Sequence, residues 1–191
     1  MVLGQSAATA AVQAIEKDVA VQDIDFEELQ RRLVEDGQVL QWTNTRSKPG
    51  IDAKSLKGIV LDDGDAKLTG AWTTSHSAAG FVGTGYRHDG NTAKGHKAAE
   101  FTPDLPKAAN YEIRIAYTAH SNRASNAKVT IKHANGTAAV LVNQKLPPSG
   151  GAFRAIGTYR CVAGQHTSVT ISTEGSDGYV IVDAVQFVPV R

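Results

Sequence analysis

The sequence predicts a mainly β protein, a jelly-roll-like antiparallel β-sandwich with an N-terminal helical hairpin. Two observations predict this fold class. Helix-type patterns are confined to the first forty residues, whereas residues 58–191 hold short runs rich in β-branched side chains, separated by Gly, Asn, Asp and Pro clusters. Many antiparallel strands joined by such turns, with no helices between them, are typical of a sandwich or jelly roll.

The first helix is expected near the start of the chain. Between Val2 and Ile15 the apolar and small residues run almost all the way round a helix, which is typical of a helix buried on every side. The opening lacks the basic n-region of a signal peptide, since no Lys or Arg precedes Lys17, and we expect no membrane span.

The second helix has clear boundary signals. Asp25 is a natural N-cap with Glu28 three residues on, and Gly37 stands where a C-terminal left-handed residue belongs. We expect the first helix to pack on the second and to cover its other face with the sandwich or with another copy of the chain. The contacts on the second helix are expected from Phe26, Leu29 and Leu33.

Composition and charge bound the function classes. With 191 residues, 41% of them hydrophobic and 20% charged, the chain fits an ordinary globular protein of one or two domains. The formal net charge of +1 gives no reason to expect nucleic acid as a partner. The charge is uneven, because residues 1–50 carry eight acidic and five basic side chains and the remainder eleven and fifteen. We therefore expect two units of different origin.

The expected boundaries follow the change in pattern. Residues 1–41 form the helical part, residues 42–57 a polar linker with a turn at Pro49-Gly50, and residues 58–191 the sandwich. In the sandwich, hairpin-like turns are expected at HANGT and EGSDG, with Gly136 and Gly178 supplying positive φ. The expected strands are GIVLD, YEIRIAYTA, AKVTIKHA, AAVLVNQ, AIGTYRCV, SVTIST and YVIVDAVQFVPV.

Asp183 interrupts the last of these strands, which is apolar on both faces. A carboxylate in such a run must be paired or coordinated. We expect it to form a buried ion pair with Arg123, whose guanidinium offers a fixed donor fork. As an alternative, the paired carboxylates of Asp62 and Asp63, with Asp65 and Asp183, form a weak calcium candidate, for which a surface turn is the simpler explanation.

No catalytic motif stands out in the chain. No G-x-G-x-x-G segment follows a strand, no G-x-S-x-G elbow exists, and the six histidines have no metal-ligand spacing. The single cysteine, Cys161, is expected to be a buried small hydrophobe. We therefore expect no enzyme activity and no cofactor in the chain as it stands.

Residues 59–188 resemble the golvesin C-terminal-like domain, also described as a xanthan-lyase carbohydrate-binding-type module. This resemblance implies a non-catalytic accessory domain that binds carbohydrate or cell-surface polysaccharide, in the periplasm or outside the cell. Flat aromatic rings for a sugar platform are then Trp72, Tyr86 and Tyr111, with core packing as the alternative for each. The matching stretches are IVLDD, GAW, GTGY, FTPDLPKAANYEI, SNRAS, KHANGTAAVLVNQ, GTYRCVAGQ and VDAVQFV.

The first forty-one residues resemble a different family. GQSAATAAVQAIEKDVAVQDIDFEELQRRLVEDGQVL is similar to the C-terminal end of bacterial FAD-dependent oxidoreductases, in which such a helix closes over the flavin. The resemblance implies that Gly4 and Gln5 would face FAD in a parent enzyme that also contained the missing dinucleotide domain. The alternatives are a sandwich that docks on that oxidoreductase without a glycan ligand, and an adhesion or assembly module, and the N-terminal helices are candidates for docking or self-association.

Overall fold

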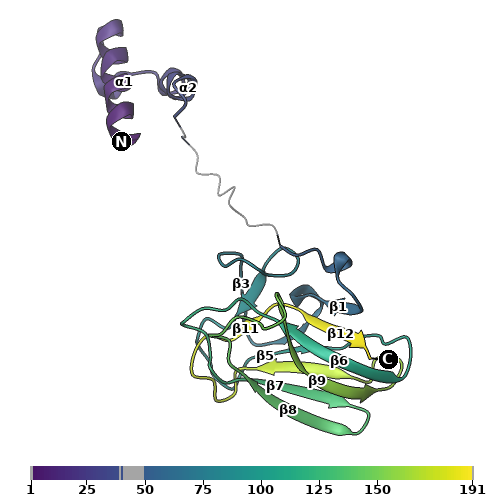
Figure 1. Ribbon diagram of the computed structural model, residues 1–191. Coiled ribbons are helices and arrows are strands. Elements are labelled where there is room, and N and C mark those ends of the chain that lie inside the picture. Colours follow the sequence, from purple (N-terminus) through teal and green to yellow (C-terminus); the bar gives the residue numbers. More distant parts are fainter. Residues whose placement is uncertain (1, 39, 41–49, 191) are drawn as a thin grey trace. The chain divides into compact units, whose positions relative to one another are not determined.

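The computed structural model describes residues 2–38, 40 and 50–190 (Figure 1). The chain divides into two compact units, Met1–Arg46 and Ser47–Arg191, and each is described by itself. The first unit is helical and the second is built from antiparallel strands, so the protein is mainly β, as the sequence predicts. None of the helices in the described ranges is long and apolar enough to cross a membrane.

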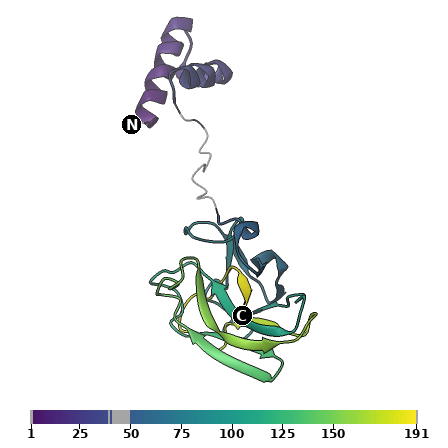
Figure 2. The same cartoon turned by 45° about the vertical axis from the view of Figure 1, so that its right-hand side comes forward.

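The helical unit contains two α-helices and a short 3₁₀ turn (Figure 2). Helix α1 spans Val2–Lys17, the 3₁₀ turn Val21–Asp23, and helix α2 Phe26–Glu35. The carboxylate of Asp25 caps α2 by accepting hydrogen bonds from the backbone N–H groups of Glu27 and Glu28 at 2.9 and 3.1 Å. Gly37 follows with a φ of +74°, which confirms both predicted ends of this helix.

Only one side of α1 is buried within this unit. The two helices contact each other, and Ala10 and Ala14 of α1 and Leu33 of α2 are buried. The predicted contact through Phe26 is wrong, because this ring is 71% exposed. At the start of α2 the contact comes from a polar group instead, because the side-chain amide of Gln13 donates to the carbonyl of Asp25 at 3.2 Å. On the far side of α1, Ile15 is 80% exposed.

The second unit contains three antiparallel sheets. Their strand orders are β1-β12-β6-β9, β2-β5-β10-β7-β8 and β11-β4-β3 (Figure 1). The first two pack face to face, and β8 lies at the edge of the five-stranded sheet. The strands are β1 Ile59–Leu61, β2 Lys67–Thr69, β3 Thr73–Ser75, β4 Tyr86–His88, β5 Ala98–Phe101, β6 Ala109–Ala116, β7 Ala127–His133, β8 Gly136–Val142, β9 Phe153–Cys161, β10 Ser168–Ser172, β11 Ile181–Val182 and β12 Val185–Pro189.

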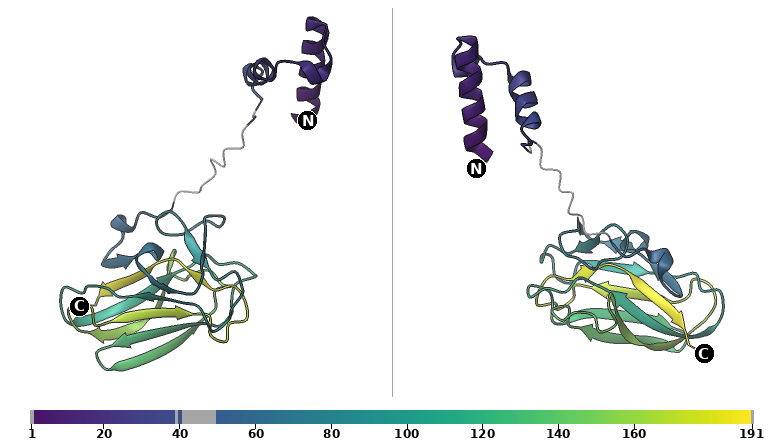
Figure 3. Two further views of the ribbon diagram at one scale, coloured as in Figure 1. Left: turned by 180° about the vertical axis from the view of Figure 1, so that it is seen from behind. Right: turned by 45° about the horizontal axis from the view of Figure 1, so that its top comes forward.

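The core of the sandwich lies between the two larger sheets (Figure 3). On β6, Ile113 and Ile115 point inward and are fully buried, as the alternating sequence pattern predicts. On β7, Val129 and Ile131 do the same from the facing sheet. Cys161 is also fully buried, and burial raises the pKa of its thiol, so the prediction of a small core residue is confirmed.

Two local features differ from the sequence-based expectation. The strands β2 to β5, all within residues 67–101, are too short to show an alternating pattern and were not expected. The EGSDG turn takes its positive φ from Gly175 rather than Gly178. Gly178 is required for another reason, because a Cβ there would lie 2.6 Å from the carbonyl oxygen of Arg123.

The expected linker, residues 42–57, is only partly covered, since 42–49 lie outside the described residues. Within the described part, Ile51 pairs with the chain ahead of β4. Its N–H donates to the carbonyl of Phe81 at 2.8 Å, and its own carbonyl accepts from Gly83 at 2.9 Å. A 3₁₀ turn, Ala53–Ser55, follows before β1.

Candidate functional site

Asp183 lies where the last strand is interrupted, between β11 and β12, and is fully buried. Both of its carboxylate oxygens accept from one donor, the backbone N–H of Val82, at 3.1 and 3.3 Å. Burial, with a smaller contribution from the charges of Asp62 and Asp63, raises the pKa of Asp183 to about 8 against the effect of this hydrogen bond. The side chain is therefore held as a neutral acid at neutral pH.

The predicted ion pair between Arg123 and Asp183 is not formed. Arg123 is 8% exposed and turns to a different set of partners. Its Nε donates to the carbonyl of Thr118 at 3.3 Å, Nη1 to Oδ1 of Asn122 at 3.2 Å, and Nη2 to the hydroxyl of Tyr86 at 3.4 Å. The prediction fails because the guanidinium of Arg123 binds these three groups, while the carboxyl of Asp183 is bound by the backbone N–H of Val82 instead.

Tyr86 anchors this arrangement from strand β4. Its ring is 1% exposed, and the guanidinium carbon of Arg123 lies 5.8 Å from the ring centroid. The hydroxyl lies 3.3 Å from Oγ of Ser75 and 3.0 Å from Oγ of Ser77. Burial alone would raise the pKa of Tyr86, but these hydrogen bonds and the charge of Arg123 outweigh it, so the pKa lies below its ordinary value.

His88 and Tyr179 lie beside this cluster and are half-buried. Their rings meet edge to face, with centroids 5.8 Å apart and planes inclined at 68°. Backbone hydrogen bonds fasten the loop of Arg123 to Tyr179, whose N–H donates to Asn122 at 3.1 Å and whose carbonyl accepts from Ala124 at 2.8 Å. The half-buried ring of Tyr179 therefore meets an imidazole, and its backbone pairs with the loop that carries Asn122 and Arg123.

We call this group the Arg123 site and define it by the residues at its centre. It combines hydroxyl, amide and imidazole groups with one half-exposed ring, a set that suits a ligand rich in hydroxyl groups. Exposed His120 extends it, because its Nδ1 lies 2.9 Å from Oδ1 of Asn122. The residues of the site are Ser75, Ser77, Tyr86, His88, Asn122, Arg123 and Tyr179.

The three aromatic residues proposed from the sequence have different environments. Tyr86 and Tyr111 are each 1% exposed, and Tyr111 donates its hydroxyl to the carbonyl of Lys107 at 3.0 Å. Neither ring has a free face for a sugar. Trp72 is half-buried, packs against the core, and donates its indole N–H to Thr69 at 3.0 Å. The half-buried aromatic ring of the Arg123 site is that of Tyr179, which is not among the rings predicted from the sequence.

The acidic candidates for calcium have other partners. Asp63 forms an ion pair with Nε of Arg87 at 3.1 Å, and the Asp65 carboxylate accepts from the backbone N–H of Asp62 at 2.9 Å. Burial raises the pKa of Asp62 to about 6. Within the described ranges, no three His, Cys, Asp or Glu residues are grouped so that they could hold a metal ion, and the calcium candidate gains no support.

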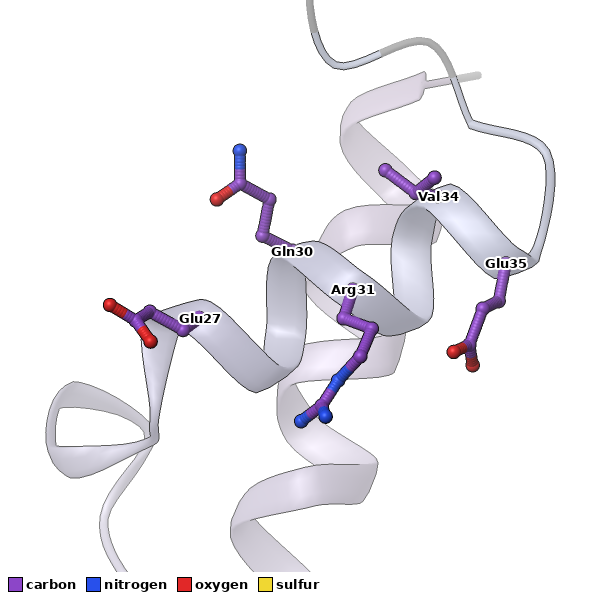
Figure 4. A pocket seen from close by; sticks show the side chains of 5 residues that line it. All are labelled: Glu27, Gln30, Arg31, Val34 and Glu35. Carbon is purple, nitrogen blue, oxygen red and sulfur yellow. The ribbon is translucent and has the colours of Figure 1, made fainter.

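The helical unit carries a surface groove of its own. Gly4 and Gln5, the positions that would face flavin in a parent enzyme, are exposed on α1. On α2, a shallow groove of about 430 Å³ lies along the helix (Figure 4). Its lining residues are Glu27, Gln30, Arg31, Val34 and Glu35.

The fold and this site define the second unit as an antiparallel β-sandwich domain whose small third sheet supplies Ser75, Tyr86 and His88 to the Arg123 site. Comparison with known proteins identifies its family. Residues 59–189 match the model of the Golvesin C-terminal domain, and the chain belongs to this family.

Two xanthan lyases are similar to the same part of the chain. The xanthan lyase of Bacillus sp. (strain GL1) is 41% identical over 141 residues, which cover 71% of this chain and 15% of that protein. The solved structure of Paenibacillus xanthan lyase gives a TM-score of 0.66 at 37% identity and covers 69% of this chain and 13% of that one. The chain thus spans a small part of the length of these relatives.

A more distant structure shares the fold. The Podospora anserina GH26-CBM35 β-(1,4)-mannanase gives a TM-score of 0.52 at 21% identity, covering 70% of this chain and 28% of that one. At this identity the similarity concerns the sandwich architecture alone.

Proposed function

We propose that the sandwich is a non-catalytic accessory domain that binds polysaccharide through the Arg123 site. The observation that carries this proposal is the half-buried ring of Tyr179, which meets the ring of His88 and whose backbone pairs with the loop of Arg123. Flat rings stack on the apolar face of a pyranose, while neighbouring donors and acceptors bind its hydroxyl groups. Membership in the Golvesin C-terminal family and the similarity to xanthan lyases support the same ligand class.

The groups of the Arg123 site are held in place before a ligand binds, so binding does not require a loop to close over the ligand. The loop of Arg123 is fixed from both sides, by the backbone hydrogen bonds of Tyr179 and by Arg123 itself, which is stacked on the buried ring of Tyr86. Because these groups are already ordered, a ligand would pay little conformational entropy on the protein side. Exposed Asn122 and His120 are the adaptable contacts at its rim.

Titration against acidic and neutral polysaccharides tests this proposal. Tyr179→Ala is expected to weaken binding about tenfold or more, equivalent to about 1.4 kcal/mol. Tyr159→Ala is the matched control, because Tyr159 is also half-buried beside a histidine, His133, at a centroid distance of 5.0 Å, but belongs to β9. Equal losses in the two variants, or no binding by the unmodified chain, would contradict the proposal.

We further propose that the sandwich is an accessory domain of a larger protein. For residues 1–41 the candidate is the C-terminal end of an FAD-dependent oxidoreductase, and the motif starting at Gly4 is what supports it. The rival reading is a sandwich that docks on a catalytic domain without a glycan. Purified chain that carries flavin absorbance would overturn our expectation that this chain does not hold FAD. Because the proposed ligand is a polysaccharide, we also propose that the protein acts in the periplasm or outside the cell.

For the helical unit we propose self-association through α2 with a second copy of the chain. The charges toward α1 are paired, since Arg32 contacts Glu16 at 2.9 Å and Glu28 at 3.1 Å. On the outer side, Glu27, Arg31 and Glu35 alternate in sign, and within the described residues none of these three forms an ion pair.

This charge pattern is self-complementary. If two copies of α2 lie antiparallel across a twofold axis near Gln30, Glu27 of each copy comes within reach of Arg31 of the other. The same arrangement covers Val34, which is 58% exposed, and brings the exposed Phe26 toward the interface. The helical unit needs such cover because, among the described hydrophobic residues, it buries only Ala10, Ala14 and Leu33.

A further inference from the structure

Two buried cations, Arg123 of the Arg123 site and Lys97 near it, have no carboxylate partner within the described residues. Arg123 and Lys97 are each 8% exposed. The ammonium of Lys97 donates to the carbonyl oxygen of Asp89 at 2.5 Å and to Oγ1 of Thr92 at 3.1 Å. Within the described ranges, neither cation takes part in an ion pair. Buried charges in proteins are normally paired, so two such cations in one region call for an explanation.

The carboxylate of Asp89, the residue whose carbonyl oxygen accepts from Lys97, already has other partners. The carboxylate of Asp89 is fully buried and accepts from the ammonium of Lys94 at 2.7 Å. It also accepts from the backbone N–H groups of Asn91 and Val180, each at 3.0 Å. Asp89 therefore neutralises Lys94 and leaves the charges of Lys97 and Arg123 uncompensated.

Both cations lie near the same imidazole, because Lys97 donates to the carbonyl of Asp89, the residue after His88, and Arg123 donates to Tyr86 on the same strand as His88. The pKa of His88 is lowered, first by burial and then by the charges of Arg123 and Lys97, with Asp89 opposing them. His88 is also the side chain that meets the ring of Tyr179. Both cations therefore contribute positive potential at the surface formed by His88 and Tyr179, where the sugar is proposed to bind.

The guanidinium also retains donors for a ligand. Arginine has five N–H donors, and Arg123 uses three of them, on Thr118, Asn122 and Tyr86. The remaining N–H groups and the adjacent amide of Asn122 are suited to a carboxylate, which binds guanidinium more strongly than a neutral hydroxyl does.

We propose that the Arg123 site selects anionic sugars, with the carboxylate of a uronic acid compensating the charges of Arg123 and Lys97 while the sugar ring lies against Tyr179. This inference rests on the proposed carbohydrate-binding function and names the ligand class of that same site. Arg123 contacts the carboxylate, and Lys97, which is held by Asp89 and Thr92, contributes through its charge.

The test compares ligands that differ only in the carboxyl group. Polygalacturonate is titrated beside its carboxyl-reduced form, and glucuronate beside glucose, by calorimetry and NMR. The acidic member of each pair is expected to bind about tenfold more tightly, and this advantage should shrink as the ionic strength rises. Equal affinity within both pairs overturns the charge inference but leaves the proposed function standing. No binding of any of the four overturns the proposed function itself.

A pair of lysine variants locates the effect in the protein. Lys97→Met keeps the aliphatic stem and removes the charge, and should reduce the preference for the acidic ligand about fivefold with little change for the neutral one. Lys128→Met is the control, since Lys128 pairs with Glu174 on exposed surface at 2.6 Å. Melting curves establish that both variants fold. An unchanged preference in folded Lys97→Met would contradict the role of this cation.

Discussion

The carboxyl group of Asp183 is bound to the backbone N–H of Val82 and to no cation within the described residues. This contact joins the break between β11 and β12 to the segment that leads into β4. A buried, neutral acid thus connects the last strand of the sandwich to the strand that carries Tyr86 and His88.

We predict that Asp183 makes stability fall as the pH rises. Its pKa is about 8 in the folded protein and about 4 in the unfolded chain, so between these values the folded state holds a proton that the unfolded state has released. The free energy of unfolding should therefore decrease by about 1.4 kcal/mol per pH unit from this group. Asp183→Asn keeps an acceptor for Val82 and should flatten the decrease, measured by urea unfolding at several pH values.

The interval above pH 6 is the most informative, because Asp62, with a pKa of about 6, has ionised there in the folded protein. Asp104→Asn, at an exposed loop position, is the control and should leave the pH dependence as it is. An unchanged slope in Asp183→Asn would show that the carboxyl is ionised in the folded state.

We predict that Arg123 and Asp183 contribute independently to stability. Arg123→Ala removes hydrogen bonds to Thr118 and Tyr86 and should cost about 1–3 kcal/mol. In a double-mutant cycle with Asp183→Asn at neutral pH, the two costs should add within about 0.5 kcal/mol. A coupling energy well above this value would contradict this prediction and support the ion pair between Arg123 and Asp183 that the sequence predicts.

We predict that Gly178→Ala disturbs the Arg123 loop. The new Cβ would lie 2.6 Å from the carbonyl oxygen of Arg123 and 2.9 Å from the backbone nitrogen of Ala124, and neither backbone atom can move aside cheaply. Unfolding should show a loss of about 1–3 kcal/mol. Gly64→Ala, where a Cβ meets nothing within 4 Å, should stay within about 0.5 kcal/mol of the parent. Similar losses at both glycines would argue against close packing at Gly178.

The long strands could be predicted from the sequence because buried and polar residues alternate along them. On β6, Tyr111, Ile113 and Ile115 alternate with polar residues, and the structure buries all three. The strands β3 and β4 could not be predicted, because three residues such as Thr73–Ser75 or Tyr86–His88 contain too few positions to show a period. Their pairing depends on neighbours distant in the chain, as with Ile181 and His88.

The candidate site was harder to predict than the core. The sequence predicts Asp183 as the partner of Arg123, but the fold places the guanidinium against Thr118, Asn122 and Tyr86, which are not identifiable as its partners from the sequence. Composition also does not tell which aromatic ring is accessible, and here Tyr86 is buried whereas Tyr179 is not. The position of Tyr179 opposite Arg123 in a β-bridge was not readable from local sequence.

We predict that charge reversal on α2 weakens self-association and that a double reversal restores it. Glu27→Arg places like charges opposite Arg31 of the second copy, and Arg31→Glu does the same with Glu27. In sedimentation experiments, the dimer of each single variant should dissociate at a higher protein concentration than the dimer of the parent. The double variant Glu27→Arg, Arg31→Glu should regain the affinity of the parent. A chain that is monomeric at every accessible concentration would contradict the self-association proposal.

The most direct test of the carbohydrate-binding proposal is an NMR titration of the isotope-labelled chain with oligosaccharides rich in uronic acid. Our account predicts that the amide shifts that change will cluster at residues 86–88, 120–124 and 178–180, around the Arg123 site. Shifts gathered instead on β7 and β8, on the outer face of the five-stranded sheet, or no shifts at saturating ligand, would contradict it.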